Sequence, residues 1–157
     1  MKKSVVFIVV TMFALGFSAF TRKDEAPSKS DLLTAKTWKM SVYQVEPAYD
    51  FLQNGIAVKD IYHAFTCYQD NTLSFKKNGK FQSQEGKNHC GSSQSEIGNW
   101  FFDPSDTILI RQAAGESFCV DIVEISESRL MYTYKTEKID ANGKKLTLTF
   151  TEEYTAQ

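Results

Sequence analysis

A period-two alternation of apolar and polar side chains recurs along this chain, and it constrains the fold more than any other feature. From Leu146 to Thr151, leucine and phenylalanine alternate with threonine, and residues 38–43 and 72–76 follow the same rhythm. Successive side chains of a β-strand point to opposite faces of its sheet. Each of these segments is therefore predicted to be a strand with one buried face.

Turn residues separate the predicted strands at short and even intervals. The strongest signal is Asn78-Gly79, a dipeptide typical of β-hairpins, and further turns are expected at residues 103–106, 113–116, 126–129 and 140–143. About eight short strands joined in this way predict a sandwich or an up-and-down barrel. Because closure removes the exposed edges of a long meander, we predict an all-β fold, an antiparallel up-and-down β-barrel.

The start of the chain has the composition of a targeting segment. Lys2 and Lys3 precede an almost unbroken apolar run from Val5 to Ala19, and charge returns at Arg22. This pattern predicts a signal peptide over residues 1–19 and export to the periplasm or the extracellular space. The apolar run is shorter than the ~20 residues of a membrane helix, so no membrane span is expected after cleavage. The alternative is an uncleaved anchor helix.

The rest of the chain is of ordinary single-domain size. Residues 20–30 are polar and predicted to form a linker, and residues 31–157 are predicted to form the barrel domain. Ser28 or Ser30 could cap a short N-terminal helix that ends near Ala35.

Charge and motif content argue against several functional classes. The net charge is −1 and the basic residues are scattered, so no nucleic-acid partner is expected. Residues 91–93 (Gly-Ser-Ser) lack the spacing of a nucleophile elbow. Glu152 and Glu153 are adjacent on a strand, and their side chains therefore point to opposite faces and cannot form an acid/base pair. We expect no catalytic residues, no enzymatic activity and no cofactor.

A set of aromatic, glycine, turn and cysteine positions runs through the predicted barrel. Its members are Leu33, Trp38, Asn54-Gly55, Asp60, Cys67, Asp70-Asn71, Leu73, Phe75, residues 78–81, Cys90, Gly98-Asn99-Trp100, Ile108 and Ile110. From about Leu32 to Phe150 this pattern resembles the lipocalin-like domain family of small exported bacterial proteins. The resemblance implies a calycin-type barrel with Trp38 at its closed end.

The chain has three cysteines, Cys67, Cys90 and Cys119. Export, the position of the first two on either side of the Asn78-Gly79 hairpin, and the family resemblance together predict a Cys67–Cys90 disulfide. Cys119 lies in an apolar strand and is expected as a buried free thiol, with a bridge between two chains as the alternative. A zinc site that adds His63 and His89 is not expected, because adjacent His89 and Cys90 are a poor pair of tetrahedral ligands.

Aromatic residues give the main functional hint. A barrel of this size is either filled by its side chains or holds one small ligand. We predict a small apolar ligand, and the resemblance implies that the apolar segment from Pro47 to His63 forms a lid; a cap that completes the core is the alternative for that segment. The alternative function is a filled-barrel interaction module or inhibitor that acts through its loops. The predicted lining residues are Phe75, Phe81, Trp100, Phe102, Tyr132 and Tyr134.

Overall fold

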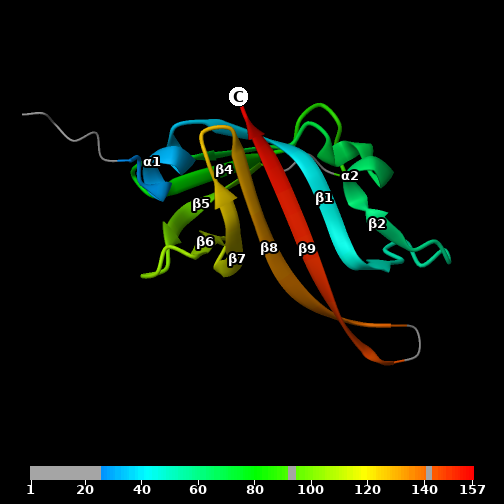
Figure 1. Cartoon of the computed structure of the whole chain (residues 1–157). Helices are drawn as coiled ribbons and strands as arrows, with labels where there is room; N and C mark the ends of the chain where they lie inside the picture. The colour runs from blue at the N-terminus through cyan, green and yellow to red at the C-terminus, as the bar shows by residue number, and fades with distance from the viewer. Residues whose placement is uncertain (1–25, 92–94, 141–142) are drawn as a thin grey trace, which may run out of the picture.

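Eight antiparallel strands close into a barrel in the computed structural model (Figure 1), which describes residues 26–91, 95–140 and 143–157. The predicted signal peptide, residues 1–19, lies outside the described residues. The predicted up-and-down barrel with a short N-terminal helix is confirmed. In ring order the strands are β1 (Thr37–Tyr49), β3 (Thr72–Phe75), β4 (Lys80–Gln84), β5 (Ser95–Phe102), β6 (Ile108–Ala113), β7 (Glu116–Ile125), β8 (Arg129–Ile139) and β9 (Lys145–Ala156).

The first strand closes the ring by pairing with two partners. Trp38 on β1 lies opposite Leu73 of β3 on one side and Ala156 of β9 on the other. The C-terminal half of β1 pairs with β9 on one side and with β2 (Val58–Asp60) on the other. The strand β2 lies outside the ring of eight. The closed ring therefore forms around the first half of β1.

Predicted turns fall between the observed strands. Gly79 has a φ of +77° and ends the loop from Lys76 that joins β3 to β4, so this loop is longer than the predicted two-residue turn. Ala114 and Gly115, with φ of +51° and +85°, join β6 to β7. Two central residues with positive φ give the twist that matches a tight hairpin.

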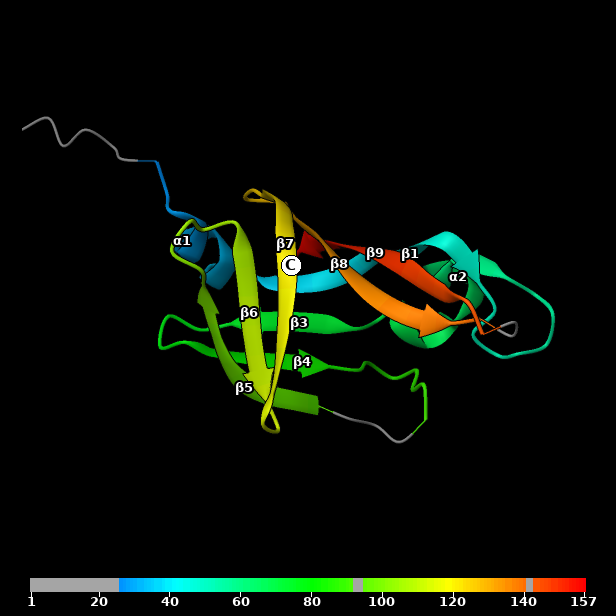
Figure 2. The ribbon, with the colours of Figure 1, turned by 90° about the horizontal axis from the view of Figure 1, so that it is seen from below.

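A short helix covers one end of the barrel. Helix α1 (Lys29–Thr34) begins at Ser28, whose hydroxyl accepts a hydrogen bond from the Asp31 amide at 3.1 Å. Leu33 is fully buried, and its carbonyl accepts a hydrogen bond from Nε1 of the fully buried Trp38 at 2.9 Å. Figures 1 and 2 show α1 and the second helix, α2 (Ile61–Ala64), at opposite ends of the molecule. We call the α1 end the closed end.

A carboxylate organises the turn between β5 and β6. Asp103 accepts hydrogen bonds from the hydroxyl of Ser105 at 2.5 Å and from the amides of Ile108 at 2.7 Å and Thr107 at 2.9 Å. These hydrogen bonds stabilise the charged form and lower the pKa of Asp103 to about 2.

Replacing Asp103 with asparagine should reduce the stability of the protein at neutral pH and weaken its acid sensitivity. The folded pKa lies below the unfolded value of about 3.9, so the carboxylate stabilises the fold above that pH. The stabilisation is lost as the pH falls through the folded pKa, that is, between about pH 4 and 2. Denaturant unfolding at several pH values should show that the free energy of unfolding falls less over this pH range in the Asp103→Asn variant than in the unaltered protein. An equal loss in both proteins would contradict this role.

The segment from Pro47 to His63 is less irregular than its sequence suggested. It continues β1 to Tyr49 and then contributes β2 and the first part of α2, and a 3-10 turn, η1 (Thr66–Tyr68), follows. Ile61 is buried in a second core cluster, against which Phe51 packs. The segment therefore completes the core as a cap. Within it Leu52 and Ile56 stay exposed, with 65% and 66% of their surfaces accessible.

The predicted disulfide and the predicted free thiol of Cys119 are confirmed, whereas the expected burial of Cys119 is wrong. Cys67 of η1 is bonded to Cys90 of the β4–β5 connection, with 5.2 Å between their Cα atoms. Cys119 is free but exposed, because it lies beside Ile110 on the outward side of β7, whereas the next residue, Val120, points into the core. In the part of the chain that the structure describes, no helix combines the length and the apolar character needed to cross a membrane.

Candidate functional site

Aromatic side chains fill the half of the barrel near the closed end. Four of the six predicted lining residues are buried in the main core cluster, and Phe102 and Tyr134 pack against it. Trp100 makes edge-on contacts with Phe75 and Phe102, each at 5.7 Å between ring centroids, and its Nε1 donates to the carbonyl of Lys76 at 3.0 Å. The buried four are Phe75, Phe81, Trp100 and Tyr132.

A polar layer lies above this aromatic half. Glu152 of β9 is buried and accepts hydrogen bonds on Oε2 from the hydroxyls of Tyr132 and Tyr154, the latter at 2.5 Å. The hydroxyls of Tyr43 and Tyr134 lie 3.0 Å apart and form a second hydrogen bond. The middle of the barrel interior therefore contains a carboxylate and several hydroxyl groups. A barrel filled only by apolar side chains would lack these groups.

The tyrosines of this layer are held in their protonated form. Burial is the main cause that raises the pKa of Tyr132 and of Tyr154, and the charge of Glu152 raises both further. The same two causes, in the same order, raise the pKa of Tyr43 and of Tyr134. At neutral pH these phenols are therefore hydrogen-bond donors.

Arg111 of β6 brings a positive charge into the same interior. Its guanidinium lies 4.8 Å from the ring centroid of Phe118 and 5.7 Å from that of Phe81, distances typical of cation–π contacts. Its Nε is buried and has no hydrogen-bond acceptor among the described residues. Within the described residues, Arg111 also forms no ion pair with a carboxylate.

The electrostatic surroundings keep Arg111 charged. Burial works to lower its pKa, but Coulomb interactions with the surrounding groups, which include the carboxylates of Glu152 and Glu96, outweigh burial and raise the pKa above its ordinary value. Arg111 is consequently a permanent cation with unused hydrogen-bonding capacity.

Two hollows adjoin Arg111. The first, which we call the lumen cavity, has a volume of about 170 Å³, and the second, the mouth recess, has about 380 Å³. Arg111 and Glu96 line both. None of the six aromatic residues predicted to line a pocket borders either hollow. The lumen cavity is bordered by Met40, Tyr43, Tyr68, Asn71, Thr72, Leu73, Ser83, Glu96, Arg111, Glu152 and Tyr154, and the mouth recess by Glu96, Arg111, Ala113, Ala114, Glu116, Ser117 and Phe118.

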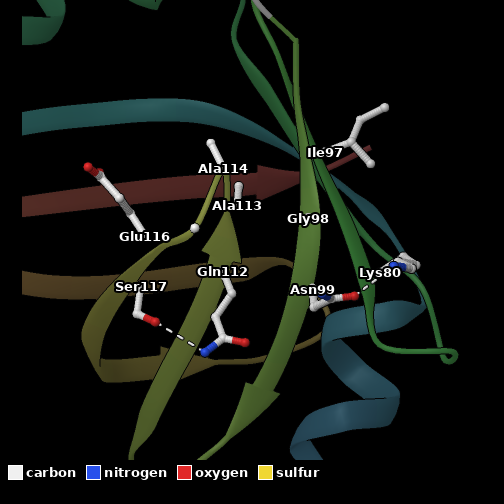
Figure 3. Close-up of a pocket in the computed structure, with 10 residues that line it drawn as sticks. Lys80, Ile97, Gly98, Asn99, Gln112, Ala113, Ala114, Glu116 and Ser117 are labelled. Atoms are coloured by element: carbon white, nitrogen blue, oxygen red, sulfur yellow. Dashed lines mark hydrogen bonds between the residues drawn. The ribbon is translucent and has the colours of Figure 1, made fainter.

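A further hollow of about 450 Å³ lies over β5, β6 and the β6–β7 turn (Figure 3). Figure 3 shows that four of its polar side chains already bond to one another: Lys80 donates to Asn99 at 2.7 Å, and Gln112 to Ser117 at 3.1 Å. These partners leave fewer groups to recognise a ligand than the lumen cavity has. The lumen cavity is the stronger candidate site.

The residues weighed as zinc ligands have other partners. Cys67 and Cys90 form the disulfide, Nδ1 of His63 lies 2.8 Å from Oδ2 of Asp60, and His89 lies near Glu85. Among the described residues, no group of three or more histidine, cysteine, aspartate or glutamate side chains is placed to hold a metal ion.

The central residues of the lumen cavity were not selected from the sequence, although the alternation contains a signal for them. Arg111 stands two residues after Leu109, and Glu152 two residues after Phe150. Both neighbours are buried, and period two therefore turns Arg111 and Glu152 to the inside as well. A charged residue in an inward position of a strand is the signal that could have found the site.

Comparisons with known proteins identify no family. No family model and no curated protein matches the chain. Among solved structures, the crystal structure of a DUF4847 family protein from Bacteroides vulgatus is similar, with 10% sequence identity and a TM-score of 0.44. The match covers 78% of this chain and 96% of that one. We take no function from this similarity.

Proposed function

We propose that this protein is an exported, lipocalin-like binding protein that holds a small acidic molecule in the lumen cavity and performs no catalysis. The Cys67–Cys90 disulfide supports export, because such bonds persist in oxidising compartments. The observation that carries the proposal is Arg111, whose buried Nε lacks an acceptor while its side chain borders the cavity.

The energetics of burial favour a ligand with an anionic group. A buried donor without an acceptor costs about 1–3 kcal/mol, and more when it is charged. A carboxylate fits the guanidinium fork with two parallel hydrogen bonds, which makes it the most suitable partner for Arg111. The guanidinium contacts the rings of both Phe81 and Phe118, and these contacts pre-position the cation for a ligand.

The proposed ligand is more polar than the small apolar one that the sequence suggested. The aromatic residues expected to line the pocket are packed into the core or belong to the polar layer, whereas the lumen cavity combines charged and hydroxyl groups with Met40 and Leu73. A short molecule with one acidic end and an apolar remainder satisfies both kinds of surface. A long lipid would exceed a cavity of about 170 Å³.

Replacing Arg111 with methionine should weaken the binding of hexanoate by about tenfold or more. The reason is that a hydrogen bond to a charged group contributes roughly 1.5–3 kcal/mol, and 1.4 kcal/mol is a factor of ten. Isothermal titration calorimetry on the purified, disulfide-bonded protein measures the affinity, with hexanol as the uncharged probe. Hexanoate should bind saturably and hexanol much more weakly.

Arg129→Met is the matched control. Arg129 already pairs with Glu124 at 2.9 Å and with Glu153 at 2.7 Å, and it does not border the lumen cavity. This variant should bind hexanoate as the unaltered protein does. Equal binding of hexanoate and hexanol, or equal losses in the two variants, would overturn the proposal.

One feature supports the alternative function of an interaction module. Phe101 pairs with Ile110, and Ile110 with Cys119, so an apolar row crosses the outward side of β5, β6 and β7. Phe101 is 44% exposed and Ile97, on the same side of β5, is 65% exposed. An exposed apolar patch is typical of interaction sites. The interaction module becomes the better-supported function if no acid binds to the protein.

A further inference from the structure

We infer that the ligand of the lumen cavity is a zwitterion, whose carboxylate binds Arg111 and whose ammonium group binds Glu152. This inference rests on the proposed function and extends it by assigning a second recognition group. Its chemical class is a free amino acid with a small or medium apolar side chain.

Glu152 has hydrogen-bonding capacity beyond the bonds it receives. Both tyrosine hydroxyls that bind it, those of Tyr132 and Tyr154, donate to the same oxygen, Oε2. A carboxylate can accept about four hydrogen bonds over its two oxygens, and among the described residues no hydrogen bond reaches Oε1 of Glu152. Since Glu152 borders the lumen cavity, an ammonium group there can bind it.

The two charges face the cavity from separate strands. Arg111 lies on β6 and Glu152 on β9, with β7 and β8 between them in the ring. They do not form an ion pair, so more than 4.0 Å separates the guanidinium nitrogens from the carboxylate oxygens. They are nevertheless close enough for the charge of Glu152 to affect Arg111. A molecule with opposite charges at a short separation can bridge them.

Charge balance favours a zwitterion over a simple anion. The lumen cavity is bordered by one cation, Arg111, and two carboxylates, Glu152 and Glu96. A carboxylate ligand alone would add a third negative charge near the buried Glu152, and a cation alone would leave Arg111 without an acceptor. A zwitterion adds no net charge, and it offers a carboxylate to Arg111 and an ammonium group to Glu152.

The dimensions fit the same class of ligand. The lumen cavity of about 170 Å³ is suited to an amino-acid backbone with a short side chain. The mouth recess, which Arg111 also borders, includes Ala113 and Phe118 and offers an apolar surface to a longer side chain.

The test compares three probes that share one carbon chain: norleucine, hexanoate and hexylamine. Calorimetry on the full, disulfide-bonded protein should show norleucine binding at least about tenfold more tightly than either singly charged probe. Glu152→Gln should lower the affinity for norleucine by about tenfold or more and leave hexanoate unchanged or tighter. Glu153→Gln is the matched control, because Glu153 is the next residue on β9 and pairs with Arg129 outside the lumen.

The outcomes separate this inference from the proposed function. If hexanoate binds through Arg111 as tightly as norleucine, the zwitterion is excluded and the acid-binding function stands. If neither binds the unaltered protein, the proposed function itself is overturned. Because the probe comparison uses the unaltered protein, it decides the question even if Glu152→Gln does not fold.

Discussion

Replacing Trp38 with alanine should lower the free energy of unfolding by about 3–5 kcal/mol, the range for large aromatic truncations in a core. Trp38 is fully buried, seals the closed end beneath α1, and lies on the strand that closes the ring with β3 and β9. Its loss also leaves the carbonyl of Leu33 without the indole donor. Urea unfolding followed by circular dichroism measures the change.

Trp38→Phe is the matched variant, since it keeps most of the apolar volume and removes the hydrogen bond to Leu33. The free energy of unfolding should fall clearly less in Trp38→Phe than in Trp38→Ala. A change below about 1 kcal/mol in the alanine variant would mean that Trp38 is not the seal of the closed end.

Removing the disulfide should be the second large effect. Substituting serine for both Cys67 and Cys90 should lower the free energy of unfolding by about 3 kcal/mol, because the bond closes a chain loop with a sequence separation of 23. The bond ties η1 to the connection between β4 and β5, on the side of the lumen cavity that Tyr68 borders. Chemical denaturation of the double variant measures the effect.

Cys119→Ser provides the control for this experiment. Cys119 is exposed and unbonded on the outward side of β7, so its replacement should change stability by less than about 0.5 kcal/mol. Equal losses in the control and in the double variant would show that the disulfide itself contributes nothing.

The barrel was predictable because its strands have one buried and one exposed face. In β9 the alternation from Leu146 continues through Glu152 to Tyr154, and the observed burial follows it residue by residue. Short elements were not predictable. The strand β2 and helix α2 have three and four residues, too few for a period to be seen, and the segment that contains them therefore resembled a loop.

The candidate site was harder to predict, for two physical reasons. Alternation shows that Phe81 and Trp100 point inward, but whether a barrel is filled or hollow depends on how all inward side chains pack. Arg111 and Glu152 share no local motif and meet only because the barrel closes. The burial of Cys119 was mispredicted because apolar residues occur on both sides of the segment 118–125, which hides the direction of its side chain.

The most direct test of the central claim is to observe the Arg111 side chain during ligand binding. The sequence has three arginines, Arg22, Arg111 and Arg129, so their Nε–Hε signals can be assigned in a ¹⁵N-labelled sample by single substitutions. During titration with hexanoate, and again with norleucine, we predict that the Arg111 signal shifts saturably and that the Arg129 signal stays in place. Saturable binding by calorimetry with no movement of the Arg111 signal would contradict the account.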